Sequence, residues 1–425
     1  MEPRSLNYIA EACGGKLRGK DAEAAGISTD SRKINSGDVF FAIKGERFDG
    51  HDYVSEIAGA SGVVVERAVP ANCAVIEVEN VRKALGAFAA RYRRDFDLPV
   101  IAIGGSNGKT TTKEVLGTIL DQKFPTVRSE ASFNNDIGVP LTLLRIGKEH
   151  RAAVLEVGTN HPGELAPLVR MIQPKYGVIT SIGREHLEFF GNVAGVAQEE
   201  GWLAELLPAD GKLFIGEGEW RDVIARRTRA KVVRVGPKLD FSTHLLGAHQ
   251  RLNVALVVAV ARELGLSDDQ IRGCLDRCKP AKMRLQLWEA KGIQVLDDSY
   301  NANTDSMLAA LETLHELPAR GRRVAILGDM AELGKHTEAA HAEVGKRVAD
   351  LGLDLLIAVG KYAAITAKTV RNAEQFADVE TACKSIPGLL RPGDLVLLKA
   401  SRAMRLERIA EILKNASIGD SKTAT

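Results

Sequence analysis

The sequence lacks long hydrophobic runs and an excess of either charge. No run of about 18 residues is continuously apolar, and the opening segment MEPRSLNYIAEACGG has no apolar stretch of signal-peptide length. The formal net charge is +2, from 57 basic and 55 acidic residues. This balance disfavours a nucleic-acid partner or an anionic membrane surface, and we expect a cytoplasmic protein without membrane insertion.

Cysteine is scarce, with five residues scattered along the chain. An odd, scattered set is typical of reduced thiols rather than of a disulfide framework. Cys274 and Cys278 would lie one helical turn apart, but no second pair or nearby histidine completes a zinc site. We predict that both are small core residues.

The 425 residues are too many for one hydrophobic core and predict about two to four domains. Short apolar runs alternate with helical patterns, which indicates an α/β fold with mostly parallel sheets. We divide the chain into a small α/β module (residues 1–82), a central doubly wound domain (83–281) and a second doubly wound, Rossmann-like domain (282–425). We expect residues 416–425, which are small and polar, to be frayed.

Residues 100–123 read VIAIGGSNGKTTTKEVLGTILDQK, which is an apolar run, a glycine turn and a helical pattern. Such a turn lets backbone N–H groups approach a polyphosphate, while Lys109 supplies an ammonium group and Thr110 a magnesium-binding hydroxyl. The usual phosphate-loop pattern has glycine where this chain has Ile103, so this is a tighter variant that starts at Gly104. The stretch predicts ATP binding in preference to a glycine turn without a nucleotide.

Ligands of parallel sheets bind at the carboxyl ends of the strands, so we consider the residues that follow each apolar run. Glu156 could complete a magnesium site with Thr110, or form a salt bridge at a strand end. His186 could ligate a second cation, or simply hydrogen-bond. Asn253, before an apolar helix predicted for residues 254–264, could bind an adenine edge or cap that helix.

Other polar residues could contact phosphate or ribose groups. In the third unit Asp298 could bind a ribose, and three cations could stabilise a phosphate transition state: Arg284, Lys399 and Arg402. In the first unit a set of donors could hold a phosphorylated group, although ordinary turns explain them equally well: Ser31, Arg32 and Lys44. From the residues alone the chain is a magnesium-dependent ATP user of three domains, with its acceptor open.

Several motifs together resemble the Mur ligase family of bacterial cell-wall synthesis. The first unit has DSR at 30–32 and GDVFFAIKGERFDGH at 37–51. The central unit has GSNGKTTTKE (105–114), FNNDIGVPLTLL (133–144), EVGTNHPGEL (156–165) and GREHLEFFG (183–191). The third unit has DDSYNANTDSM (297–307), LGDMAELG (327–334) and KASR (399–402). The first and second motifs of the third unit are typical of the branch that adds a dipeptide.

The resemblance implies a UDP-sugar-binding first domain, a central ATP-binding domain and a third domain for the incoming dipeptide. It implies ATP and Mg²⁺ as cofactors, and UDP-N-acetylmuramoyl-tripeptide and D-alanyl-D-alanine as substrates, joined through an acyl phosphate. The implied catalytic residues are Lys109, Glu156, His186 and Arg284. The implied nucleotide contacts are Gly105, Ser106, Asn107, Gly108, Lys109, Thr110, Thr111, Asn253, Arg284 and Asp298. The implied substrate contacts are Ser31, Arg32, Lys44, Asn134, Asn135, Tyr300, Asn301, Asn303, Lys399 and Arg402.

The sequence departs from the family pattern at four positions. Relatives usually carry a carbamylated lysine, which steadies the second magnesium ion, where this chain has Glu200. Our hypothesis is that Glu200 supplies a genetically encoded carboxylate, so that the implied metal ligands are Thr110, Glu156, His186 and Glu200. The other departures are Gln250 for asparagine, Thr304 for proline and Ala400 for glycine.

Three alternatives remain open at this point. The first is a sibling ligase that adds a different amino acid, including a folylpolyglutamate-type enzyme, against which the run from Asp30 to His51 argues. The second is a phosphotransferase or ATPase switch, and the third is a precursor-binding protein without activity. We expect a monomer whose domains close by hinge motion near Lys282 and around residues 80–95.

Overall fold

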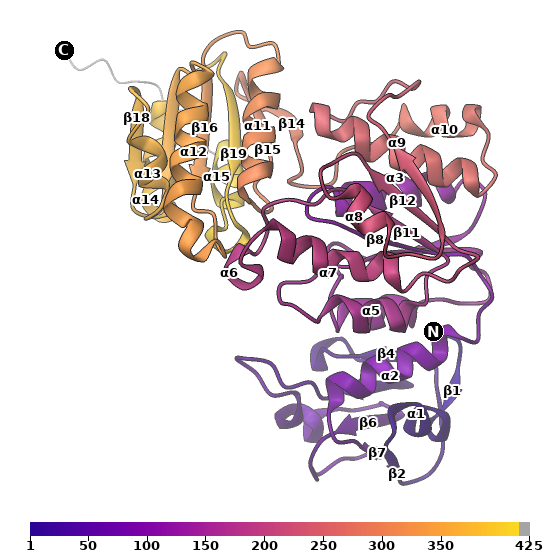
Figure 1. Ribbon diagram of the computed structural model, residues 1–425. Helices are drawn as coiled ribbons and strands as arrows, with labels where there is room; N and C mark the ends of the chain where they lie inside the picture. The colour runs from indigo at the N-terminus through magenta and orange to yellow at the C-terminus, as the bar shows by residue number, and fades with distance from the viewer. Residues whose placement is uncertain (416–425) are drawn as a thin grey trace.

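The computed structural model describes residues 1–415 and contains three main sheets, one after another along the chain (Figure 1). The first unit and the third unit lie at opposite ends, with the central unit between them. The predicted frayed segment, residues 416–425, lies outside the described residues. Within residues 1–415 no helix has the length and apolarity needed to cross a bilayer.

The first unit is built on a five-stranded sheet of order β2-β7-β6-β5-β4, in which only the β2–β7 pair is antiparallel. The three predicted strands are confirmed to within two residues, whereas β2 and β4 are short and were not predicted. A two-stranded ribbon pairs β1 with β3. The bounds are β1 Arg4–Ser5, α1 Leu6–Cys13, β2 Lys16–Arg18, β3 Glu23–Ala24, β4 Gly26–Ser28, η1 Ser31–Lys33, β5 Asp38–Phe41, η2 Gly50–Glu56, β6 Gly62–Val65 and β7 Ala74–Glu77.

Helix α2 (Val81–Arg93) joins the first unit to the central one. Its Phe88 stacks on Phe41 of the first sheet, with ring centroids 6.2 Å apart. Its Tyr92 is fully buried and donates a hydrogen bond to the carbonyl of Ile146 at 2.6 Å. Helix α2 therefore packs on both units.

The central unit is a six-stranded sheet of order β13-β12-β11-β8-β10-β9, and every pair is parallel, as predicted. Successive strand residues point to opposite faces: Ile101 and Ile103 pack under α3 and α9, whereas Val100 and Ala102 pack under α5 and α7. The bounds are β8 Val100–Gly104, α3 Lys109–Leu120, β9 Thr126–Arg128, α4 Gly138–Leu143, β10 Ala152–Glu156, α5 Leu165–Ile172, β11 Tyr176–Ile179, α6 Leu187–Phe190, α7 Val193–Glu205, β12 Lys212–Gly216, α8 Arg221–Ala225, β13 Lys231–Val235, α9 Ala248–Glu263 and α10 Asp268–Leu275.

Three details of the central unit differ from the sequence predictions. The short strand β9 was not predicted. Helix α9 begins at Ala248, so Asn253 lies inside the helix and does not cap it. Helix α10 ends at Leu275, so Cys278 follows the helix rather than lying one turn along it. Both Cys274 and Cys278 are nevertheless buried, as predicted, and burial raises the pKa of the Cys278 thiol to about 12.

The third unit is a six-stranded sheet of order β14-β15-β19-β16-β17-β18, parallel except for the edge strand β14, which was not predicted. Helices α11 to α13 cover one face, and α14 and α15 the other. The bounds are β14 Gln286–Ala290, β15 Ile293–Asp297, α11 Thr304–Glu316, β16 Arg323–Gly328, η3 Gly334–His336, α12 Thr337–Asp350, β17 Leu355–Val359, α13 Ala363–Ala367, β18 Ala373–Phe376, α14 Val379–Leu389, β19 Leu395–Lys399, η4 Arg402–Met404 and α15 Glu407–Asn415.

Candidate functional site

A glycine loop connects β8 to α3, as the sequence predicts. Gly105 and Gly108 have φ angles of +110° and +88°, which side chains rarely adopt. A Cβ on Gly105 would lie 2.5 Å from the hydroxyl of Thr180. The backbone N–H of Ser106 donates to the carbonyl of Ser181 at 2.8 Å, which fixes the loop to the end of β11. The loop therefore has the form of a phosphate-binding turn at a helix N-terminus.

Lys109, the first residue of α3, folds back over this loop. Its ammonium group donates to the carbonyl of Gly105 and lies 3.6 Å from the Glu185 carboxylate. Burial lowers the pKa of Lys109, but Glu185, Glu200 and Glu156 outweigh burial and raise it above its ordinary value. Lys109 therefore carries its charge at neutral pH, beside the position that the loop offers to phosphate.

Thr110 and Glu156 meet across the loop, although 46 residues separate them. The Thr110 hydroxyl donates to Glu156 at 2.9 Å, and the Asn134 side-chain amide donates to the other carboxylate oxygen at 2.9 Å. Glu156 ends strand β10 and is 2% exposed. A hydroxyl and a carboxylate at this place are oxygen ligands of the kind that Mg²⁺ uses together with phosphate and water.

No three His, Cys, Asp or Glu side chains within residues 1–415 come close enough together to hold a metal ion. A cation at Thr110 and Glu156 would therefore draw its remaining ligands from substrate phosphates and water. The donor set fits magnesium, which keeps several waters, better than it fits a metal held entirely by protein side chains.

His186 lies on a loop of the central unit that is hydrogen-bonded to the third unit. Its Nδ1 is 2.5 Å from the Glu332 carboxylate, and the backbone N–H of Glu188 donates to the Glu332 carbonyl at 2.9 Å. Arg184 forms ion pairs with Asp305 at 2.7 Å and with Glu343 at 2.6 Å. These acidic residues were not among the predicted site residues, although Asp305 and Glu332 lie within the family motifs at 297–307 and 327–334. Their pairing with the His186 loop could not be predicted from the sequence.

The third unit contributes a second group of polar side chains. Asp298 and Lys399 form a buried ion pair, and Lys399 also donates to the carbonyl of Asn301 at 3.0 Å. The Leu285 backbone N–H donates to Asp298 at 3.1 Å. Burial lowers the pKa of Lys399 in spite of Asp298. In this structure the Asp298 carboxylate interacts with Lys399 and with the Leu285 backbone, and its ribose contact stays a prediction.

Two side-chain hydrogen bonds join the central and third units near the glycine loop. The Tyr300 hydroxyl donates to Ser132 at 2.6 Å, and Asn303 donates to the side-chain oxygen of Asn107 at 3.1 Å. Arg284 reaches Thr110 at 3.4 Å and lies 4.1 Å from the centre of the Tyr300 ring. Arg284 therefore stands beside the predicted phosphate site although it comes from the linker between the units.

These groups surround a cavity of about 650 Å³ between the central and third units. Most of the predicted site residues line it: Ser106, Asn107, Gly108, Lys109, Thr110, Thr111, Asn134, Asn135, Glu156, His186, Arg284, Asp298, Tyr300, Asn301, Asn303, Lys399 and Arg402. Glu185, Glu332, Ser132 and His249 also line it and were not predicted. The cavity has the size of an ordinary small-molecule site.

The remaining predicted site residues lie elsewhere, so the described lining of the cavity does not include them. Asn253 lies beneath the loop: a Cβ on Gly108 would be 2.5 Å from its side-chain oxygen, and its amide donates to Gln250 at 2.9 Å. Three residues belong to the first unit, where Arg32 pairs with Asp30 at 2.8 Å: Ser31, Arg32 and Lys44. Gly105 and Glu200 are the others, and their contacts lie behind the loop.

Glu200, on α7, is fully buried behind the loop. One carboxylate oxygen accepts a hydrogen bond from the Gly105 backbone N–H at 2.7 Å, and the other has no partner within residues 1–415. Burial raises the pKa of Glu200 to about 7, with Lys109 opposing and Glu185 reinforcing the shift. Glu200 thus braces the loop in this structure, and its role as a metal ligand stays a prediction.

Three family models match successive parts of the chain. They describe a Mur ligase family catalytic domain at residues 23–93, a Mur ligase middle domain at 103–238, and a Mur ligase glutamate ligase domain at 283–402. The chain is 33% identical over 448 aligned residues to the UDP-N-acetylmuramoyl-tripeptide–D-alanyl-D-alanine ligase of Escherichia coli K12, covering 96% of this chain and 98% of that protein.

Two solved structures of MurF are also similar to this chain. A crystal structure of MurF from Acinetobacter baumannii superimposes with a TM-score of 0.91 at 31% identity, covering 98% of this chain and 100% of that one. The MurF ligase of Thermotoga maritima in complex with ADP superimposes with a TM-score of 0.82 at 27% identity, covering 91% and 96%.

Proposed function

Since the chain belongs to the Mur ligase family, we propose that it joins D-alanyl-D-alanine to UDP-N-acetylmuramoyl-tripeptide with ATP as the energy source. The observation that carries this proposal is the cavity in which Lys109, Thr110 and Glu156 face Arg284 and Lys399 of the third unit. Full-length similarity to ligases that bear this activity in their names supports the choice of substrates.

The chemistry requires activation of a carboxylate. A carboxylate is a poor acyl donor at neutral pH, and transfer of the γ-phosphoryl group gives it a leaving group. The dipeptide amine then attacks the acyl carbon, the C–O bond to phosphate breaks, and phosphate leaves with its electron pair. The amine nitrogen loses its proton, and the products are the pentapeptide precursor, ADP and phosphate.

The charges of the site suit the first step, in which a triphosphate and a carboxylate must approach each other. Lys109 and Arg284 place positive charge on two sides of the glycine loop, and the backbone N–H groups at the start of α3 add a partial positive charge. Both cations are held before substrate arrives, Lys109 by Gly105 and Glu185, Arg284 by Thr110 and Tyr300. Such preorganised charges stabilise phosphoryl transfer.

Magnesium completes this proposal. We assign Thr110 and Glu156 to a first ion and His186 to a second, with Glu200 as the carboxylate that replaces a carbamylated lysine. When bound, the metal neutralises phosphate charge and orients the γ-phosphoryl group. Glu332 pairs with Nδ1 of His186, which leaves Nε2 for a cation, and the carboxylate would then orient the imidazole ring.

We assign the remaining tasks by domain. The first unit holds the UDP-sugar through Ser31, Arg32 and Lys44, and the third unit holds the dipeptide near Tyr300, Asn301 and Asn303. In this proposal the enzyme acts as a monomer in the cytoplasm, where ATP is abundant. Hinge motion near Lys282 and around residues 80–95 brings the domains together over the substrates.

The decisive experiment omits each substrate in turn and measures phosphate release, with mass spectrometry of the product of the full reaction. We expect pentapeptide precursor only when ATP, tripeptide and D-alanyl-D-alanine are all present. Lys109→Ala should abolish product, while Lys238→Ala, an exposed lysine on the same domain, should not. Equal ATP turnover without the dipeptide would refute the ligase assignment.

A further inference from the structure

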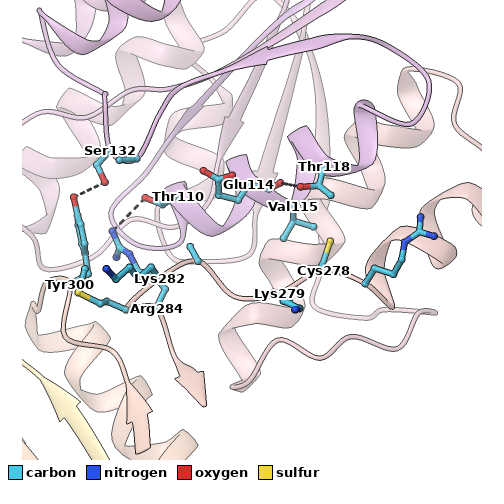
Figure 2. A pocket seen from close by; sticks show the side chains of 14 residues that line it. Thr110, Glu114, Val115, Thr118, Ser132, Cys278, Lys279, Lys282, Arg284 and Tyr300 are labelled. Carbon is cyan, nitrogen blue, oxygen red and sulfur yellow. Dashed lines mark hydrogen bonds between the residues drawn. The ribbon is translucent and has the colours of Figure 1, made fainter. Parts of the chain in front are cut away.

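A second cavity lies on the outer side of α3, next to the site described above (Figure 2). Its volume is about 560 Å³, which falls within the range of roughly 300–1,000 Å³ typical of small-molecule sites. Helix α3 and the loop at Ser132 form one wall, and the linker that leads from α10 to β14 forms the other. The proposed reaction uses Thr110, Arg284 and Tyr300 at one end of this space, and assigns nothing to the part lined by Val115, Thr118 and Cys278.

The lining of this linker cavity combines an apolar floor with positive charge. Val115 and Cys278 are buried, and Ala131, Ala281 and Met283 add further apolar surface. Four basic side chains line the same space, and none of them forms an ion pair within residues 1–415: Arg277, Lys279, Lys282 and Arg284. The single acid, Glu114, is already paired with Lys113 at 2.7 Å. The charge left uncompensated is therefore positive.

The positive groups are spread along the cavity: Lys282 and Arg284 lie toward the catalytic side, and Lys279 lies beside Cys278. Figure 2 shows Lys282 and Arg284 close to Thr110 and Tyr300, with Thr118 and Cys278 toward the other end of α3. The Arg284 guanidinium lies over the Tyr300 ring, 4.1 Å from its centre, and this contact holds the cation at the edge of the cavity. A ligand that fits this lining has a planar apolar body and one anionic group.

We propose that the linker cavity is a second ligand site, for an aromatic anion that carries a sulfonate, carboxylate or phosphate group. The ring lies on the floor formed by Val115 and Met283, and the anion is held by Lys282 and Arg284. The two cavities share Thr110, Ser132, Arg284 and Tyr300, but Val115, Thr118 and Cys278 line only the linker cavity.

Occupancy of the linker cavity also affects the nucleotide site, because both cavities share Arg284. Met283 and Leu285, on either side of it, have φ angles of +60° and +50°, which confines the linker to a narrow set of conformations. An anion in the linker cavity attracts Arg284 away from nucleotide phosphate. Since coupling between sites is reciprocal, ADP and the aromatic anion weaken each other. Only this coupling rests on the proposed function; the site itself does not.

The test uses 2-naphthalenesulfonate as the probe and measures its binding to the full chain by calorimetry, without ligation substrates. We expect one site with a dissociation constant below about 1 mM. Lys279→Glu combined with Lys282→Glu should weaken binding at least tenfold, and Thr118→Trp, which fills the cavity, should abolish it. Lys20→Glu, a charge reversal in the first unit, should leave binding unchanged. The uncharged 2-naphthalenesulfonamide should bind at least tenfold more weakly than the sulfonate.

ADP distinguishes the linker cavity from the nucleotide site. As ADP rises, the apparent dissociation constant of the probe should increase several-fold and then reach a plateau, as negative coupling requires. A rise without limit would mean that the probe occupies the nucleotide site, and would overturn the proposal. So would absence of binding to the parental protein, or equal binding to the charge-reversed variant. None of these outcomes depends on whether the chain ligates a dipeptide.

Discussion

The carboxylate of Glu200 accepts a hydrogen bond at 2.7 Å from the backbone N–H of Gly105, so a residue of α7 holds the glycine loop from behind. Gly104 makes this approach possible, because a Cβ there would lie 2.7 Å from the same carboxylate oxygen. The glycines therefore leave room on both sides of the loop, for phosphate on one side and for Glu200 on the other. This contact separates two roles for Glu200 that mutation can resolve.

Replacing Glu200 separates its structural role, as hydrogen-bond acceptor for the glycine loop, from the role of its negative charge. Glu200→Ala leaves a buried N–H without an acceptor and a small cavity, and should lower the free energy of unfolding by about 2–4 kcal/mol. Glu200→Gln keeps an acceptor of the same shape and should retain most of that stability. If Glu200 also serves a second magnesium ion, the glutamine variant should need about tenfold more Mg²⁺ for half-maximal ligation. An unchanged magnesium dependence would contradict the metal assignment.

Gly108→Ala should damage the nucleotide site more than the fold. The new side chain meets a left-handed backbone, which costs about 1–2 kcal/mol, and also the Asn253 side-chain oxygen at 2.5 Å. Gly163→Ala is the matched control, because its φ is +91° and nothing lies within 4 Å of the added Cβ. We expect both variants to lose stability from backbone strain, Gly108→Ala more because of the Asn253 contact, and only Gly108→Ala to lose at least tenfold in ADP affinity by calorimetry. Equal ADP affinity in the two variants would contradict the role given to the loop.

Thr304→Pro should stabilise the third unit. Thr304 is the first residue of α11, where proline is favoured, and Asn303 before it is extended at φ −128° and ψ 172°, as a residue before proline requires. The buried Thr304 hydroxyl has no partner within residues 1–415. We expect the free energy of unfolding to rise by about 0.4–1 kcal/mol. Thr304→Ala, measured in parallel by urea unfolding, isolates the contribution of the hydroxyl; a loss of stability in the proline variant would show that the site rejects it.

His249 should make stability depend on pH. Burial lowers the pKa of His249 below its ordinary 6.5, with Lys399 acting in the same direction and Asp298 opposing. The native state therefore binds this proton less readily than the unfolded chain, so the free energy of unfolding falls as pH drops below 6.5. The slope from one such group is at most about 1.4 kcal/mol per pH unit. Urea unfolding at a series of pH values should show this loss in the parental chain and less of it in His249→Gln. His315→Gln, at an exposed position on α11, should retain the full dependence.

The alternation of apolar runs was enough to predict the three α/β units, because the inner parallel strands, such as β8, β10 and β19, are buried on both faces and leave a continuous signal. Strands β2, β4 and β9 were missed because each has only three residues, and β18 because Glu374 and Gln375 occupy its centre. The edge strand β14 alternates Gln286, Trp288 and Ala290 with exposed Leu287 and Glu289, a pattern too weak to separate from a loop. The start of α9 was misplaced because polar residues at 249–251 hid its first turns.

The local sequence alone determined the glycine loop, since strand, turn and helix are consecutive and their conformations follow from neighbouring residues. It also determined that Lys109 and Thr110 begin the helix beneath any bound phosphate. Only the tertiary structure decided that Glu200 stands behind that loop, that Glu332 holds His186, and that Arg284 reaches Thr110 across 174 positions. Such pairings depend on how sheets and helices pack, and packing is a property of the whole chain that no short segment encodes.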